Sequence, residues 1–64
     1  MELNKSYLIK STLTFDMPIQ KIVVEEVTKL CFKVRFENNH RTWFEYDDFG
    51  KKYYVIEDLG FQGQ

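Results

Sequence analysis

The 64-residue sequence lacks the features that mark exported and membrane proteins. It has one cysteine, Cys31, so no internal disulfide can form, whereas small secreted domains usually depend on several. The N-terminal segment has no uninterrupted apolar run of the kind found in signal peptides, and no stretch approaches the roughly 18 apolar residues of a membrane-spanning helix. We therefore expect a cytoplasmic protein with no membrane partner.

Residues that carry chemistry are also scarce. His40 is the only imidazole, and no serine or cysteine nucleophile can be assigned beside it. One cysteine and one histidine do not make a zinc quartet, and the segment DDFGKK at 47–52 lacks the alternating oxygen ligands of a calcium loop. The acidic pairs, such as Glu25 and Glu26, are interpreted as solubilising charges. The sequence therefore predicts no enzyme, no metal and no cofactor.

Few residues break the chain, which has three glycines and one proline. No internal repeat or low-complexity segment divides it, so residues 1–64 are predicted to form a single small domain. With 44% apolar and 17% aromatic residues the chain is too hydrophobic for disorder. Large aromatic side chains suit the thin core of a small β domain.

The N-terminal third shows strand periodicity. From Tyr7 to Phe15 apolar and polar residues mostly alternate, which predicts a half-buried strand that ends at the segment DMP, 16–18. The run IQKIVVEEVTKL, 19–30, is rich in β-branched residues, although Val23, Val27 and Leu30 have helical spacing. A strand is favoured here, with Glu25 and Glu26 at a bend or bulge.

The segment LCFKVRFENNHRTWFEY, 30–46, predicts a β-hairpin. A three-residue loop at 38–40 separates apolar from charged side chains, whereas a two-residue loop would bury Glu45 and Arg41. The expected pairs are Phe36 with Thr42, Val34 with Phe44 and Phe32 with Tyr46 on one face, and Glu37 with Arg41, Arg35 with Trp43 and Lys33 with Glu45 on the other. Asn39 or His40 should have a positive φ. Trp43 is then predicted to lie on the outer, polar face.

After the hairpin, DDFG predicts a turn and YYVIEDL, 53–59, a last strand. Both faces of this strand are apolar, which is typical of a strand that is buried on two sides in a small closed barrel. The tail, 60–64, is expected to be frayed. Residues 1–18 are interpreted as an added edge strand or an arm exchanged with a partner.

Together these patterns predict an all-β fold, a small antiparallel meander of four to five strands that curls into a barrel. The strand IVVEEV, the hairpin 30–46, the turn DDFG and the strand YYVIEDL resemble, over residues 22–59, the SH3-like barrels, including Tudor-type modules. The resemblance implies a small binding module and carries no specific site residues.

A candidate binding surface follows from the hairpin register. Lys33, Arg35, Arg41 and Trp43 share its outer face, where an aromatic platform beside basic groups can contact a partner. The leading hypothesis is protein–protein interaction, or self-association, by a bacterial or phage-type accessory domain. Single-stranded nucleic acid is the alternative, because residues 19–41 carry more basic than acidic side chains. A structural subunit of an assembly, or a Trp43 packed under its neighbours, is also compatible with the sequence.

Overall fold

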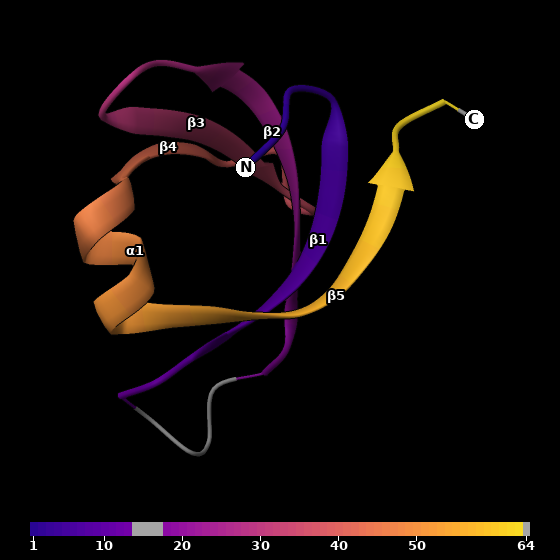
Figure 1. Cartoon of the computed structure of the whole chain (residues 1–64). Helices are drawn as coiled ribbons and strands as arrows, with labels where there is room; N and C mark the ends of the chain where they lie inside the picture. The colour runs from indigo at the N-terminus through magenta and orange to yellow at the C-terminus, as the bar shows by residue number, and fades with distance from the viewer. Residues whose placement is uncertain (14–17, 64) are drawn as a thin grey trace.

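The computed structural model describes residues 1–13 and 18–63, and its main feature is one strongly curved antiparallel sheet of five strands (Figure 1). The elements are β1 (Lys5–Ser11), β2 (Gln20–Val27), β3 (Cys31–Phe36), β4 (Arg41–Glu45), α1 (Tyr46–Lys52) and β5 (Tyr53–Phe61). The strand order is β4-β3-β2-β1-β5, so the first four strands form a meander and β5 returns to pair with β1. The predicted small all-β fold is confirmed. The resemblance to SH3-like barrels stays a prediction.

The N-terminal strand lies inside the sheet, and the prediction of an edge strand or exchanged arm is wrong. β1 pairs with β2 on one side and with β5 on the other. Its alternation buries Tyr7 and Ile9 in the core, so this segment contributes to the fold itself. The strand ends at Ser11, so the predicted strand is wrong for Thr12 and Leu13, which form a bend. The rest of the predicted strand, to Phe15, and most of the segment 16–18 lie outside the described residues.

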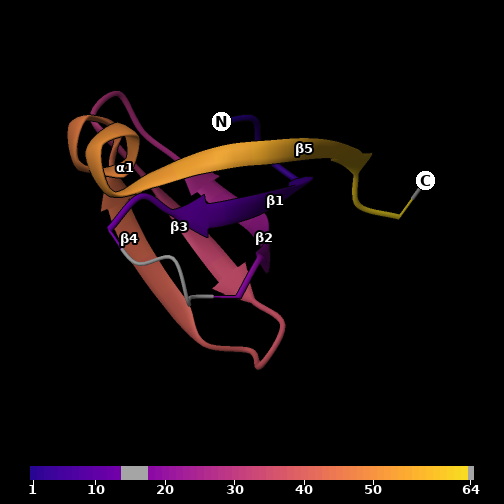
Figure 2. The ribbon, with the colours of Figure 1, turned by 90° about the horizontal axis from the view of Figure 1, so that it is seen from below.

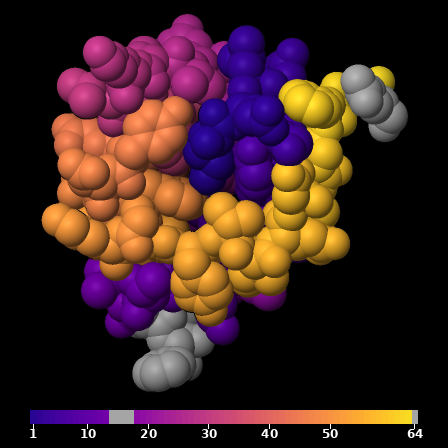
Figure 3. All heavy atoms as spheres, viewed as in Figure 1, coloured from indigo at the N-terminus to yellow at the C-terminus, as the bar shows by residue number. Residues whose placement is uncertain are grey.

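The end of the chain is held in place, so the prediction of a frayed tail is wrong for residues 60–62. β5 continues to Phe61, and the Gln62 N–H donates to the Asn4 carbonyl at 2.6 Å. The Ser6 hydroxyl also contacts the Gln62 amide oxygen at 2.9 Å. In the space-filling view the N-terminal segment packs directly against β5 (Figure 3). The two ends of the chain therefore stabilise each other.

The hairpin loop has the predicted length but lies one residue earlier. The Asn39 N–H donates to the Phe36 carbonyl at 3.0 Å, and the Phe36 N–H donates to the His40 carbonyl at 2.8 Å. The loop is therefore 37–39, not 38–40. Asn39 has the expected positive φ, 67°.

This earlier loop shifts the strand pairing by two residues. Phe32 faces Phe44 and Lys33 faces Trp43, so the predicted pairs are wrong. Because side chains alternate with a period of two, a shift of two leaves each one on its predicted face. Packing favours the observed register, since the Phe32 and Phe44 rings lie 5.8 Å apart. The observed register also places Arg35 opposite Arg41. This like-charge pair needs an acidic side chain from another strand to compensate it.

Residues 46–52 form helix α1, where the sequence predicted a turn. Acidic Asp47 and Asp48 lie in its first turn, and basic Lys51 and Lys52 in its last, an arrangement that favours the helix dipole. The decisive contact is tertiary: Phe49 is buried, with its ring 5.3 Å from that of Phe32. A seven-residue helix is too short to be stable alone, so this packing is what holds it.

The core lies on the concave side of the sheet. Its fully buried members are Ile9, Ile22, Val24, Phe32 and Val34. Phe44, Phe49 and Tyr53 extend it as an aromatic cluster between β4, α1 and β5. The view from below shows α1 between the ends of β4 and β5, the two outer strands of the sheet (Figure 2).

The last strand is not buried on two sides, contrary to the prediction. Tyr53 packs into the core, but Tyr54 and Ile56 are 47% and 43% exposed. β5 is an edge strand, and its pairing with β1 shifts twice along its length. Such irregularities bend an edge strand and hinder its pairing with further chains.

Candidate interaction surface on the outer face of the sheet

All four candidate residues lie on one face of the hairpin, as predicted. Lys33 and Arg35 alternate along β3 with the buried Phe32 and Val34, which fixes their side chains on the convex side. Arg41 and Trp43 have the same relationship to the partly buried Thr42 and Phe44 on β4. We refer to Lys33, Arg35, Arg41 and Trp43 as the outer patch.

Trp43 is half-exposed at the centre of β4, with 48% of its surface accessible. Its cationic neighbour is Lys33, whose Nζ lies 5.8 Å from the centre of the indole ring. The sequence predicted Arg35 in this position; the two-residue shift replaces it with Lys33. An ammonium at this distance interacts favourably with the ring, by about 0.5–1 kcal/mol at an exposed site.

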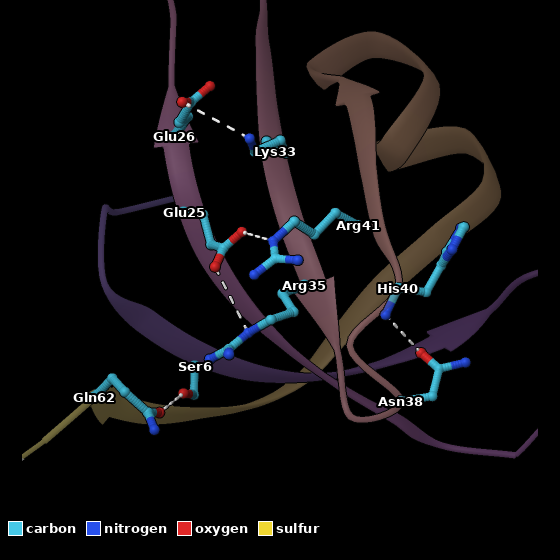
Figure 4. A network of polar contacts seen from close by, with 9 residues as sticks. All are labelled: Ser6, Glu25, Glu26, Lys33, Arg35, Asn38, His40, Arg41 and Gln62. Carbon is cyan, nitrogen blue, oxygen red and sulfur yellow. Dashed lines mark hydrogen bonds and ion pairs between the residues drawn. The ribbon is translucent and has the colours of Figure 1, made fainter.

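Glu25 connects the two arginines of the outer patch. Its Oε1 accepts a hydrogen bond from Arg41 Nε at 2.8 Å, and its Oε2 lies 3.6 Å from Arg35 Nε (Figure 4). The like-charge pair across β3 and β4 is thus compensated by a carboxylate from β2. Interpreting this glutamate only as a solubilising charge was wrong.

A bulge in β2 makes this arrangement possible. The pairing with β3 shifts between Val24 and Glu26, so Glu25 is an extra residue in the strand, as the sequence suggested. Both neighbouring glutamates then reach the outer face, and Glu26 Oε1 lies 3.8 Å from Lys33 Nζ (Figure 4). In a regular strand one of the two would point to the opposite face. The doublet EE within a β-branched run was the only sequence signal for this.

The acidic residues of the outer face differ from those expected. Glu37 was predicted opposite Arg41 but lies in the hairpin loop, and Glu45 was predicted opposite Lys33 but faces Cys31. Three carboxylates, of Glu25, Glu26 and Glu45, accompany the three cations of the outer patch. The surface is therefore mixed in charge, and its ion pairs, being partly exposed, each stabilise the fold by only about 0–1 kcal/mol.

A second polar cluster joins the two ends of the chain. Lys5 Nζ lies 2.6 Å from Asp58 Oδ2 and 2.8 Å from Glu2 Oε2. Its ammonium is also 5.4 Å from the centre of the Phe61 ring. Hydrogen bonds to Asp58 and Glu2 raise the pKa of Lys5 above its ordinary value, and the bond from Lys5 lowers the pKa of Asp58. These contacts fasten the N-terminus to β5, which is a structural role.

His40 and Cys31 have local partners. The His40 ring stacks on Phe36 at 6.2 Å between centroids, and its backbone N–H donates to Asn38 Oδ1 at 3.0 Å. Cys31 Sγ lies 3.1 Å from Thr28 Oγ1. In residues 1–13 and 18–63, no group of three or more His, Cys, Asp or Glu side chains is placed to hold a metal ion.

Two further properties of the chain are its potential to span a membrane and its similarity to known proteins. Within the described ranges no helix has the length and apolarity needed to cross a bilayer. Comparison of the chain with protein-family models, curated proteins and solved structures finds no significant match.

Proposed function

We propose that the protein is a non-enzymatic interaction module that binds a protein partner through the outer patch. The observation that carries the proposal is the half-exposed Trp43 with a cation 5.8 Å from the centre of its ring, on the convex face of the sheet. Tryptophan and arginine are the residues that most often dominate protein interfaces. The outer patch supplies both types within two paired strands.

Pre-organisation supports a role in recognition. Glu25 holds the Nε groups of Arg35 and Arg41, and Lys33 is positioned between Glu26 and the indole. Side chains that are already ordered lose less conformational entropy on binding. The Arg41 bond to Glu25 uses Nε, one of the five N–H donors that a guanidinium carries. A partner surface with carboxylates around an apolar centre would match this arrangement.

The strand order, with a short helix before a last strand that pairs with the first, is in keeping with the resemblance to SH3-like barrels. We include that fold type, a cytoplasmic location and a bacterial or phage origin in the proposal. The location rests on the single cysteine, Cys31.

Binding of single-stranded nucleic acid is the second candidate, favoured by the aromatic and basic composition of the outer patch. Against it, Glu25 and Glu26 pair with all three cations, which reduces the attraction for phosphates. Phosphate contacts make affinity fall steeply with salt. The two functions can be separated by an NMR titration with mixed-sequence oligonucleotides that follows the Trp43 indole signal. The titration is run at about 20 and about 200 mM salt, a roughly tenfold ratio. Localised, salt-sensitive shifts would favour nucleic acid over protein.

The direct test is affinity capture from native cells with three forms of the chain. We expect the wild type and the control Tyr54→Ala, which removes an exposed aromatic from β5, to capture the same protein. Trp43→Ala should lose it while keeping a native NMR spectrum. Equal capture by all three forms would reject the outer patch as the binding surface.

A further inference from the structure

The proposed function uses side chains of β4 but not its backbone edge on the side away from β3. In the part of the chain that the structure describes, β4 is a terminal strand of the sheet and is paired with β3 on one side only. Figure 2 shows it along the margin of the sheet, with α1 at one end. An unpaired strand edge is a template for another strand.

The backbone groups available at this edge can be assigned. Phe36 donates to the His40 carbonyl at one end of the hairpin, and Tyr46 donates to the Leu30 carbonyl at the other. Hydrogen-bonded and non-hydrogen-bonded pairs alternate in an antiparallel ladder. Arg41 and Trp43 therefore belong to non-hydrogen-bonded pairs with β3, and their N–H and C=O groups point away from it. The Glu45 N–H does the same.

There is space beside this edge. A hollow of about 430 Å³ is lined by residues from the start of β3, from β4, from α1 and from the start of β5, namely Cys31, Trp43, Phe44, Glu45, Asp48, Lys52 and Tyr53. The hollow follows the half of the strand that leads into the helix. Among the described residues, no strand other than β3 is hydrogen-bonded to β4.

The sequence of β4, RTWFE, is complementary to itself in antiparallel orientation. When two copies pair about a two-fold axis at Trp43, Arg41 of each copy lies opposite Glu45 of the other. In this register Arg41, Trp43 and Glu45 each face a residue whose backbone groups also point outward, and the two Trp43 residues form a hydrogen-bonded pair. Thr42 and Phe44, which bond to β3, face each other as non-hydrogen-bonded pairs. Shifting the register by two residues in either direction removes both Arg–Glu pairs. Glu45 is exposed and has no ion-pair partner among residues 1–13 and 18–63, so it is available for this contact.

The other terminal strand is less suited to this pairing. β5 is longer, but its pairing shifts indicate extra residues near Ile56 and Leu59. The Gly60 N–H is already bonded to Asp58 Oδ1 at 2.9 Å. Bulges of this kind protect an edge. β4 has a continuous register over its whole length.

We propose that two copies of the chain associate through β4, antiparallel and centred on Trp43, to form one continuous ten-stranded sheet across a two-fold axis. This goes beyond the proposed function, because it uses the strand edge and names the partner as a second copy. The pairing leaves the side chains of the outer patch on the convex face. It brings two such patches together into one symmetric surface.

The primary test is the oligomeric state in solution. Sedimentation equilibrium should give a mass that rises from 7.8 kDa toward twice that value with concentration. Because interfaces below about 1,200 Å² are usually weak, we expect the change over roughly 10 µM to 1 mM. Amide hydrogen exchange at Arg41 and Trp43 should slow as the concentration rises. A monomer throughout that range, or concentration-independent exchange at these amides, would overturn the proposal.

Charge variants test the register. Glu45→Arg and Arg41→Glu should each weaken self-association at least tenfold, because they place like charges opposite one another. Mixed in equal amounts, the two variants should form a heterodimer with two opposite-charge cross-strand pairs, one the native Arg41–Glu45 pair and the other the same pair with its charges exchanged. Glu57→Arg, on the β5 edge, is the matched control and should dimerise like the wild type. Failure of the mixture to associate, or loss of the dimer in the control, would contradict pairing through β4.

Discussion

Glu25 Oε1 and Arg41 Nε lie 2.8 Å apart although the two residues are 16 positions apart in the sequence and belong to the strands on either side of β3. This bond connects β2 with β4 across β3, and it compensates the Arg35–Arg41 pair that the hairpin register creates. The contact depends on the bulge that turns Glu25 to the outer face. Charge on this face is therefore organised by three strands together.

Removing the Glu25 carboxylate should destabilise the fold slightly. We expect Glu25→Gln to lower the free energy of unfolding by about 0.5–1 kcal/mol, since an exposed network loses its central anion and leaves two arginines adjacent. Urea denaturation of the variant and of Glu37→Gln, a loop control, measures the difference. The loss should grow at low ionic strength, where the repulsion is less screened. An equal effect in the control would show that Glu25 has no special role.

The same variant should change the affinity for polyanions. Without Glu25, Arg35 and Arg41 are left uncompensated, so Glu25→Gln should bind single-stranded oligonucleotides more tightly than the wild type. The dependence of log affinity on log salt should also steepen. Fluorescence anisotropy of a labelled oligonucleotide measures both. Unchanged binding would mean that the carboxylate does not shield the outer patch.

Phe32 should be the most sensitive core position. It is fully buried, and its ring contacts those of Phe44, Tyr46 and Phe49. Phe32→Ala is expected to cost about 3–5 kcal/mol, enough to unfold a domain of this size. Leu30→Ala, at a residue that is 76% exposed, should change stability by less than about 0.5 kcal/mol. Circular dichroism and thermal unfolding compare the two, and a folded Phe32→Ala would contradict this description of the core.

The hairpin register can be checked directly. Lys33 and Trp43 form a non-hydrogen-bonded pair, in which the Hα atoms of the two residues approach closely. A strong Hα–Hα NOE is therefore expected between them, with none between Arg35 and Trp43. Asn39→Val should destabilise the loop by about 1–2 kcal/mol, because a β-branched residue tolerates its φ of 67° poorly. Asn39→Gly is the matched control and should be tolerated.

Acid should weaken the contact between the chain ends. Lys5 lowers the pKa of Asp58 below its ordinary value of 3.8. A carboxyl with a depressed pKa in the folded state stabilises the protein above its unfolded pKa, and this contribution is lost as the pH falls through the folded one. The free energy of unfolding should thus fall below pH 3.8, and the fall should be smaller in Asp58→Asn. Urea titrations at several pH values measure this, and identical profiles would contradict it.

Local sequence patterns are enough to predict the β class and the two faces of the hairpin, with Trp43 on the outer one. Alternation with a period of two encodes these properties locally, and they survive even a shift of two residues. The sequence also indicated the bulge at Glu25 and the positive φ of Asn39, because both depend on residue types at single positions.

The other features of the fold depend on contacts between residues far apart in the sequence. The register was set by Phe32 packing on Phe44, and helix α1 by the burial of Phe49, contacts that no local pattern contains. The position of β1 inside the sheet depends on pairing with β5, some fifty residues away. The carboxylate that compensates Arg35 and Arg41 comes from β2. The bulge in β2 turns Glu25 to the outer face, and the pairing of β3 with β4 places the two arginines beside it. Local sequence preferences give several strand registers similar stability, and long-range packing determines which of them forms.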